Sequence, residues 1–279
     1  MGLVNLEAVL RDANEKEYAV PSFNVTTFEG LKGLMAAAQE ERAPLILAVT
    51  PKFLNYFGPD YLCPMVLSTA GKSDLPVVFH MDHGKSVKDV QTAMVHGFTS
   101  VMIDGSLLPF EENAELTARV TEFAHSVGIS VEGELGTILL AADEQENSGM
   151  TDPDLAATFV KETGVDALAV SVGNAHGLYT AEPNIDVKRL EEIHAGTGAS
   201  LVLHGGSGTP KITEMIQAGL RKININADFQ KAFYRTVRQA IEEHPGELLY
   251  TDALLGGGVE AVKKAAVEKI RLLKANGRY

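Results

Sequence analysis

Eight short apolar runs recur along the chain, and each is followed by a segment with the apolar spacing of a helix. Near-continuous apolar strands that alternate with helices are typical of a parallel sheet covered on both faces. Eight such units in 279 residues predict a closed (β/α)8 TIM barrel, as a single domain over residues 1–279. The alternative is an open, doubly wound sheet. The expected strands lie at 18–23, 44–49, 75–80, 99–104, 129–135, 166–172, 200–204 and 222–226.

The segments between these strands carry helix signals. Thr151 or Asp152 is placed to cap a helix whose first residue is Pro153. An additional C-terminal helix is expected at about 258–274, after the sequence "LLGGG", which is interpreted as a flexible turn. The other expected helices lie at 27–41, 59–72, 86–96, 110–127, 153–163, 187–197, 210–220 and 227–243.

A polar residue stands at the carboxyl end of every expected strand. In a barrel these ends converge on one mouth, where the active site lies, whereas an open sheet would keep the first and eighth ends apart. The pattern therefore favours the barrel. In chain order the residues are Asn24, Thr50, Asp82 with His83, Asp104, Glu134, His176, His204 and Asn224.

The overall charge and the single cysteine narrow the classes of function. A net charge of −13 argues against general binding to nucleic acid or to an anionic membrane surface. No apolar run approaches the roughly 18 residues that a membrane span needs. Cys63 has no partner for a disulfide within the chain, which fits a reducing compartment. We therefore expect a cytoplasmic protein with no nucleic-acid or membrane partner.

Three histidines form the clearest candidate site. His83, His176 and His204 each end a different strand, and each precedes a glycine. Three neutral imidazoles with an open fourth position are typical of catalytic zinc, which can polarise a substrate carbonyl. The glycines would let substrate and backbone approach closely. The sequence therefore predicts one divalent metal at the mouth of the barrel.

The acidic residues near these histidines leave several interpretations open. Asp82 could be a ligand, a carboxylate that orients a ligand, or a general acid or base. Because adjacent residues on a strand point to opposite sides, Asp82 and His83 would not easily share one metal, so we favour the acid–base role. Glu134 shares a strand face with Glu132 and could be an alternative ligand, a residue that supports the ligands, or a salt-bridged barrel residue. For His80 we prefer a satisfied interior histidine over a second metal site.

Two glycine- and asparagine-rich stretches follow the seventh and eighth strands. These are "HGGSG" (204–208) and "NINAD" (224–228). Barrels often bind phosphate with the loops after these two strands. Glycine N–H groups, the Ser207 hydroxyl and the positive end of a helix that starts near Ala227 could together hold an anion.

These motifs together resemble the class II, zinc-dependent ketose-bisphosphate aldolases, in particular the tagatose- and fructose-bisphosphate branch. The resemblance covers nearly the whole chain. It rests on "FNV" (23–25), "HMDHG" (80–84), "SVMIDGS" (100–106), "VEGELG" (131–136), "TGVDALAVSVGNAHGLY" (163–179), "LVLHGGSG" (201–208) and "KININAD" (222–228).

The resemblance implies a role for each matching position. His83, His176 and His204 would bind the catalytic zinc, with Glu134 as an alternate or nearby ligand. Asp82 would exchange a proton with the C4 hydroxyl of a ketose 1-phosphate or 1,6-bisphosphate. Cleavage would give dihydroxyacetone phosphate and an aldehyde without a Schiff-base lysine.

The resemblance also implies substrate contacts and partners. Asn224 would contact the triose portion, and a monovalent cation, Na⁺ or K⁺, would lie beside the phosphate near the carbonyls of Gly177 and Gly205. We expect a small phosphorylated sugar as substrate and a homodimer or homotetramer as the assembly. The other substrate or phosphate contacts would be Asn24, Ser207, Asn226 and Asp228.

The loop after "ELG" departs from the family pattern. Leu139–Leu140 replace the usual Gly-Gly, and Ala141 and Ala142 stand where carboxylates are expected. Asp143 or Glu144 could substitute for these carboxylates by a shift of the loop.

Two further positions bear on the substrate. Ala227 replaces a threonine that usually contacts phosphate, and Gly256 stands where an arginine usually reaches the distal phosphate across a subunit interface. Lys52 could replace that charge from within the chain. The alternative function is therefore a metal-dependent barrel with a different acceptor or without aldol activity, such as an isomerase or a binding protein.

Overall fold

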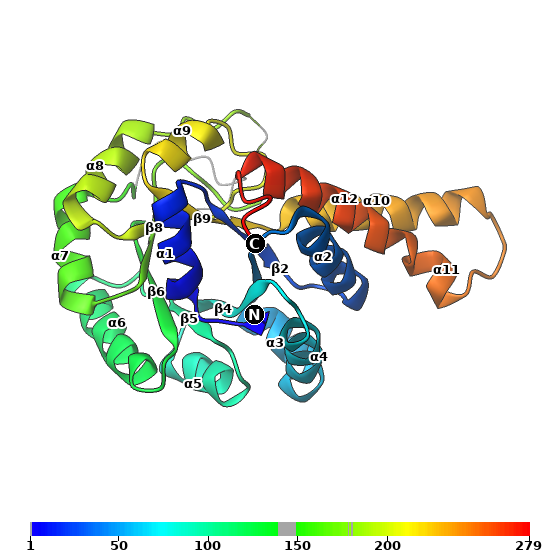
Figure 1. Ribbon diagram of the computed structural model, residues 1–279, viewed down its shortest axis with the longest axis horizontal. Helices are drawn as coiled ribbons and strands as arrows, with labels where there is room; N and C mark the ends of the chain where they lie inside the picture. Colours follow the sequence, from blue (N-terminus) through cyan, green and yellow to red (C-terminus); the bar gives the residue numbers. More distant parts are fainter. Residues whose placement is uncertain (1, 139–148, 178, 180) are drawn as a thin grey trace.

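A computed structural model describes residues 2–138, 149–177, 179 and 181–279. Eight parallel strands, β2 to β9, form a closed barrel, because β2 pairs with β9 and β4 pairs with β5 (Figure 1). The predicted TIM barrel is thus confirmed, and each predicted strand is present. The strands are β1 (Gly2–Leu3), β2 (Val20–Asn24), β3 (Leu45–Val49), β4 (Pro76–Gly84), β5 (Ser100–Ile103), β6 (Ser130–Leu135), β7 (Ala167–Val170), β8 (Ser200–Leu203) and β9 (Leu220–Ile225).

Helices between the strands surround the barrel. Four elements were not predicted from the sequence, namely β1, α1, α3 and α11. The helices are α1 (Leu6–Lys16), α2 (Phe28–Glu41), α3 (Pro51–Phe57), α4 (Pro59–Gly71), α5 (Val87–Val95), α6 (Phe110–His125), α7 (Pro153–Thr163), α8 (Val187–Thr197), α9 (Ile212–Gln217), α10 (Ala227–Glu243), α11 (Thr251–Leu255) and α12 (Gly257–Leu272).

Helix α1 covers the end of the barrel opposite the candidate site. Its backbone N–H at Glu7 donates to the Ser130 hydroxyl at the start of β6, and its Asn14 amide donates to Ser200 at the start of β8. Because this end is closed, the opposite mouth is the one open to a substrate.

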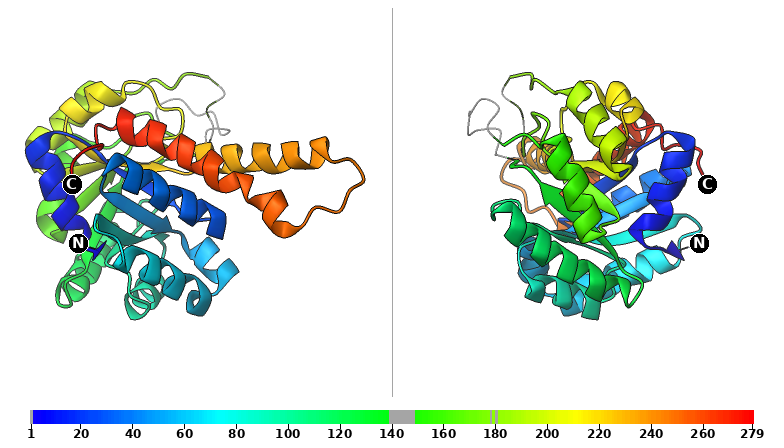
Figure 2. Two further views of the ribbon diagram at one scale, coloured as in Figure 1. Left: turned by 45° about the vertical axis from the view of Figure 1, so that its right-hand side comes forward. Right: turned by 90° about the vertical axis from the view of Figure 1, so that its left-hand side faces the viewer.

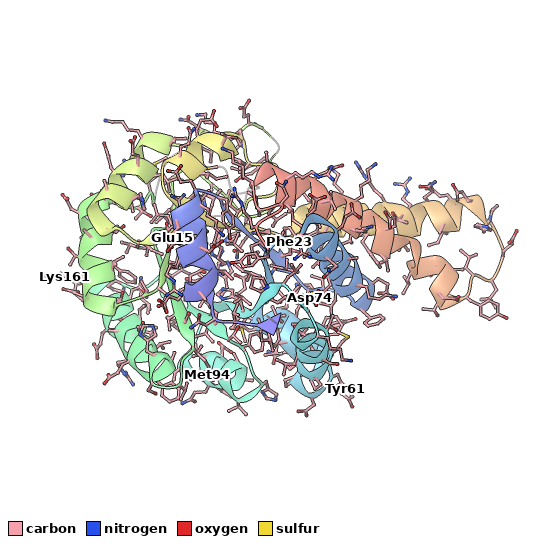
Figure 3. All side chains as sticks on the ribbon, in the orientation of Figure 1. Glu15, Phe23, Tyr61, Asp74, Met94 and Lys161 are labelled. Carbon is pink, nitrogen blue, oxygen red and sulfur yellow. The ribbon has the colours of Figure 1, made fainter. Side chains whose placement is uncertain are left out.

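The packing outside the barrel fixes the helix that begins after β9. Phe23 on β2 is fully buried and meets Phe229 of α10 edge to face, with ring centroids 4.6 Å apart. Figure 3 shows Phe23 among the central side chains, whereas Lys161 extends outward from α7. This contact anchors the first turn of α10 beside the mouth of the barrel.

Helices α10, α11 and α12 form an arm that extends away from the barrel (Figures 1 and 2). The expectation of a flexible turn at "LLGGG" was wrong, because Leu254 and Leu255 belong to α11 and Gly257 starts α12. These glycines allow close helix packing. A Cβ on Gly258 would lie 2.2 Å from the Phe233 ring of α10. The predicted additional C-terminal helix is confirmed as α12.

Candidate active site

The three predicted histidines converge at the open mouth of the barrel. His83 belongs to the end of β4, His176 to the loop after β7, and His204 directly follows β8. One nitrogen from each ring lies within 4.8 Å of the others. The closest pair is Nε2 of His83 and Nδ1 of His204, 2.9 Å apart.

His83 reaches this cluster because the strand is irregular there. Its φ of 53° lies in the left-handed region, and the register of β4 against β5 shifts between Met81 and Gly84. The strict alternation of side chains therefore fails, so that Asp82 and His83 face the same site. Their nearest atoms, Oδ1 of Asp82 and Nε2 of His83, are 4.0 Å apart.

Two carboxylates determine which nitrogen each ring presents. Nδ1 of His83 lies 2.7 Å from Asp104, and Nε2 of His204 lies 2.9 Å from Glu132. A carboxylate can only accept a hydrogen bond, so each of these nitrogens carries the hydrogen. The two facing nitrogens would then both present lone pairs at 2.9 Å, which requires a proton or a cation to lie with them.

This arrangement fits zinc. Zn–N distances of about 2.0–2.1 Å in a tetrahedral site place two nitrogens about 3.3 Å apart, so only a small displacement is needed. Without metal, a proton takes this place. Burial opposes charge on His83, but Asp82 and then the Asp104 hydrogen bond raise its pKa to about 9. Burial, followed by the nearby His83 charge, lowers the pKa of His176 to about 4 and that of His204 well below its usual value.

Asp82 is a buried carboxylate whose two oxygens are each held by an amide. Asn24 donates to Oδ2 and Asn224 to Oδ1, both at 2.9 Å. Burial alone would raise the pKa of Asp82, but the positive charge of His83 and the other nearby cationic groups lower it to about 2. The carboxylate is therefore ionised at neutral pH. Asn24, which the sequence suggested as a substrate contact, has an amide hydrogen committed to Asp82.

Glu134 and Asp104 form a second acidic group around His83. One oxygen of each carboxylate and one nitrogen of His83 lie within 4.8 Å of one another. Asp104 accepts hydrogen bonds from His83, Lys85 and Ser106, which hold its pKa far below the usual range despite burial. Burial and the Asp104 charge raise the pKa of Glu134 to about 8, and among the described residues its buried Oε2 has no hydrogen-bond partner.

Glu132, on the same face of β6 as Glu134, is the salt-bridged barrel residue. Its Oε2 lies 2.6 Å from Nζ of Lys222, and both side chains are fully buried. His80 is also fully buried, and its Nδ1 lies 2.9 Å from the Ser100 hydroxyl. Within the described part of the chain its Nε2 has no hydrogen-bond partner, so His80 is an interior histidine that is only half satisfied.

A cavity of about 190 Å³ joins the histidines to the predicted phosphate loops. Among the predicted residues, Glu134 and Asp228 are not part of its lining. The carboxylate of Asp228 instead lies 2.7 Å from Lys269, and its backbone N–H donates to the Ser207 hydroxyl. The cavity is lined by Asn24, Thr50, Asp82, His83, His176, Gly177, His204, Gly205, Ser207, Asn224, Asn226 and Ala227.

The glycines that follow the histidines serve different purposes. A Cβ on Gly84 would lie 2.6 Å from the Met102 carbonyl, and one on Gly205 would lie 1.9 Å from the Ala175 carbonyl. Both are therefore needed for close packing of the chain itself. Among the described residues, no atom lies within 4 Å of a Cβ added to Gly177, whose φ is 101°. Within that part of the chain, only Gly177 of the three leaves space for a substrate.

The loop positions that depart from the family pattern, Leu139–Leu140, Ala141 and Ala142, lie outside the described residues, as do Asp143 and Glu144. Among the described residues, no helix is both long and apolar enough to cross a membrane.

The parallel barrel, the three imidazoles and the ionised aspartate beside them define a TIM-barrel enzyme of the metal-dependent kind. Residues 4–278 match the family described as class II fructose-bisphosphate aldolase. The chain belongs to this family, whose members are zinc-dependent lyases.

Individual relatives agree with this assignment. A fructose-bisphosphate aldolase of Geobacillus stearothermophilus is 38% identical over 285 residues, covering 100% of this chain and 99% of the relative. A probable fructose-bisphosphate aldolase of Bacillus subtilis is 40% identical over 278 residues, covering 97% of each chain. The crystal structure of the YdjI aldolase from Escherichia coli K12 superposes with a TM-score of 0.88 at 36% identity, covering 99% of each chain.

Proposed function

We propose that this protein reversibly cleaves a ketose 1-phosphate or ketose 1,6-bisphosphate of the fructose or tagatose type into dihydroxyacetone phosphate and an aldehyde. The observation that carries the proposal is the pair of facing nitrogens on His83 and His204. They lie 2.9 Å apart, which requires a proton or a cation with them, and each lies 4.0 Å from Oδ1 of the ionised Asp82. His83, His176 and His204 would bind one zinc ion. Bound zinc would polarise the substrate carbonyl and stabilise the charge left on the dihydroxyacetone phosphate half when the C3–C4 bond breaks.

Asp82 is assigned the proton transfer at the C4 hydroxyl. Both of its oxygens already accept an amide hydrogen, from Asn24 and Asn224, so the carboxylate is held beside the histidines without being drawn onto the metal. Because its pKa is lowered to about 2, Asp82 is ionised at neutral pH and has a lone pair available for a hydroxyl proton. This supports the acid–base role over the role of a ligand. Asn224 would contact the triose portion as well.

The substrate phosphate is proposed to bind between Gly177 and the first turn of α10. Ser207 and Asn226 line the same cavity, and α10 directs its positive end toward it. The N–H of Asp228 supports the Ser207 hydroxyl from behind. Gly205 also lines this cavity and would lie beside the bound phosphate.

A monovalent cation, Na⁺ or K⁺, beside this phosphate is part of the same proposal. The carbonyl of Gly205 accepts hydrogen bonds from the hydroxyls of Tyr179 at 3.1 Å and Thr209 at 2.9 Å. A cation at this carbonyl would have to displace one of these hydrogens. The turned hydroxyl oxygen could then serve as a further ligand.

The aldehyde half is proposed to lack a lysine or arginine contact from its own chain. Asn24 also lines a neighbouring apolar compartment of about 240 Å³ at the mouth of the barrel. Lys52 lines neither this compartment nor the cavity that contains the histidines, and Gly256 stands where the family has an arginine. This favours an acceptor other than glyceraldehyde 3-phosphate. Apart from Asn24, the compartment is lined by Thr26, Thr27, Gly30, Leu34, Phe53, Phe229, Gln230, Phe233, Tyr234, Val237, Leu255 and Val262.

A homodimer or homotetramer is proposed from the arm. Phe229 is the buried residue of α10, and α11 has none, so these two helices of the arm bury little of their own surface. Large hydrophobic side chains remain exposed along it, including Tyr234, Ile241, Leu248 and Tyr250. A second copy of the chain would cover them. Light scattering on the purified protein tests this directly.

Zinc analysis and a cleavage assay test the function together. We expect one zinc per chain in the wild type, and loss of zinc when His83, His176 or His204 is replaced by alanine. The matched control is His96→Ala, which removes an imidazole at the end of α5. Chelation should abolish release of dihydroxyacetone phosphate, and added zinc should restore it. Full zinc occupancy in all three variants would overturn the ligand set, and cleavage that survives complete zinc removal would overturn the metal-dependent reaction.

A further inference from the structure

Glu132 connects three strands across the interior of the barrel. It belongs to β6, whereas Lys222 belongs to β9 and His204 follows β8. One carboxylate oxygen, Oε1, lies 2.9 Å from Nε2 of His204, and the other, Oε2, lies 2.6 Å from Nζ of Lys222. The side chains of Glu132 and Lys222 are fully buried, and that of His204 is nearly so.

We propose that Glu132, anchored by Lys222, is a positioning residue that makes His204 bind the metal through Nδ1. His83, whose Nδ1 is held by Asp104, presents Nε2 instead. The metal would therefore bind His204 through Nδ1 and His83 through Nε2. This inference rests on the proposed zinc site.

The ring of His204 has two orientations that differ by a half turn about its last side-chain bond. In the observed orientation Nε2 meets Glu132 and Nδ1 faces His83. A half turn would place carbon atoms at both positions, so the metal would lose its ligand and the carboxylate its donor. Glu132 therefore selects the one orientation that can bind metal, and it fixes the hydrogen on Nε2.

Lys222 provides the opposite charge that Glu132 needs in the barrel interior. A buried carboxylate without such a partner is strongly unfavourable. The pair could be no more than a structural ion pair of the barrel. The two readings differ in one measurable respect, because a purely structural pair can be replaced by apolar residues without weakening metal binding.

The variants separate an effect on protein stability from an effect on the orientation of His204. Glu132→Leu with Lys222→Met removes both charges together and leaves no unpaired buried ion. Its melting temperature should stay near that of the wild type. Its zinc affinity, measured by competition with a chromophoric chelator, should fall about 10- to 100-fold, which is typical for loss of a group that orients a ligand. Ser100→Ala is the matched control, because it removes a buried partner of His80 and leaves His204 untouched.

A second measurement needs no variant. ¹⁵N NMR of the histidine rings in the zinc-loaded wild type should show His204 bound through Nδ1 with the hydrogen on Nε2. Zinc bound through Nε2 of His204, or wild-type zinc affinity in the folded double variant, would overturn the role of Glu132. A wild-type protein that binds no zinc would overturn the metal site itself and this role with it. If the double variant does not fold, the NMR result decides.

Discussion

Zinc should compete with a single proton at His83. Nε2 of His83 faces Nδ1 of His204 at 2.9 Å, and without metal the pKa of His83 is raised to about 9. His83 is therefore protonated at pH 7. The pKa values of His176 and His204 are lowered, so these rings are already neutral. Binding of zinc at pH 7 should release one proton, and that proton comes from His83.

The pKa of about 9 for His83 sets the magnitude and the sign of the pH dependence of zinc affinity. Above that pH His83 is neutral and the zinc affinity is constant. Below it, each pH unit should weaken the apparent affinity about tenfold, or about 1.4 kcal/mol. At pH 7 the affinity should thus lie about 100-fold, or about 2.7 kcal/mol, below its plateau.

A chelator competition series from about pH 6 to pH 10 measures the slope. Calorimetry in buffers with different ionisation enthalpies counts the protons released. An affinity that is independent of pH between 7 and 9, or release of a proton from each of the three histidines at pH 7, would refute the assignment. The Asp104→Asn variant gives a sharper test of the assignment to His83. It removes a carboxylate that raises the pKa of His83, so the break in the curve should move to lower pH.

Four other predictions concern catalysis, substrate and stability. Asp82→Ala should keep its zinc and lose about 10² to 10⁴ in kcat, whereas loss of zinc would show that Asp82 is a ligand. Ser207→Leu should raise KM for a ketose 1-phosphate at unchanged zinc content, and an unchanged KM would count against the phosphate site. Gly258→Ala should lower stability by about 1–3 kcal/mol, seen as a lower Tm, because its Cβ would meet the Phe233 ring. Gly71→Ala, where an added Cβ meets nothing within 4 Å, is the control. In a panel of ketose 1-phosphates, fructose and tagatose 1,6-bisphosphate should be cleaved without being preferred, since a lost charged contact costs about 1.5–3 kcal/mol. A bisphosphate that is about tenfold better than every other member would refute the shifted acceptor.

The barrel could be predicted because strand burial leaves a direct mark on the sequence. Interior parallel strands are apolar on both faces, so the eight runs stand out from the amphipathic helices. Helix α1 escaped prediction for a different reason. Helix α1 buries Leu6, Val9, Leu10 and Ala13, a helical spacing that the sequence does show. It precedes the first barrel strand, where the strand–helix alternation predicts no helix.

The arm shows where local signals mislead. Three glycines in a row normally indicate a flexible turn. Here Gly257 and Gly258 lie in α12 with Thr236 and Phe233 of α10 packed against their α-carbons. The close approach of two helices selects glycine just as a turn does. Sequence alone does not reveal whether another helix is near.

The groups that support the ligands depend on distances across the barrel. His83, His176 and His204 could be predicted as candidate ligands because each lies at, or shortly after, the carboxyl end of its own strand. Glu132 and Lys222 are far apart in the chain, and no sequence pattern around either residue indicates that the two form an ion pair. The one available signal was a charged residue at an inward position of an otherwise apolar strand. Such a residue needs a partner of opposite charge on another strand.

The four carboxyl groups around the histidines differ in their hydrogen-bond partners. They belong to Asp82, Asp104, Glu132 and Glu134. Asp82 is held by two amides, Asp104 by a histidine, a lysine and a serine, and Glu132 by a lysine and a histidine. Each of these three is committed to its neighbours. Among the described residues, Glu134 has a buried oxygen with no hydrogen-bond partner, and its pKa is raised to about 8. A cation near His83 would supply the missing partner. We therefore propose Glu134 as the alternate ligand.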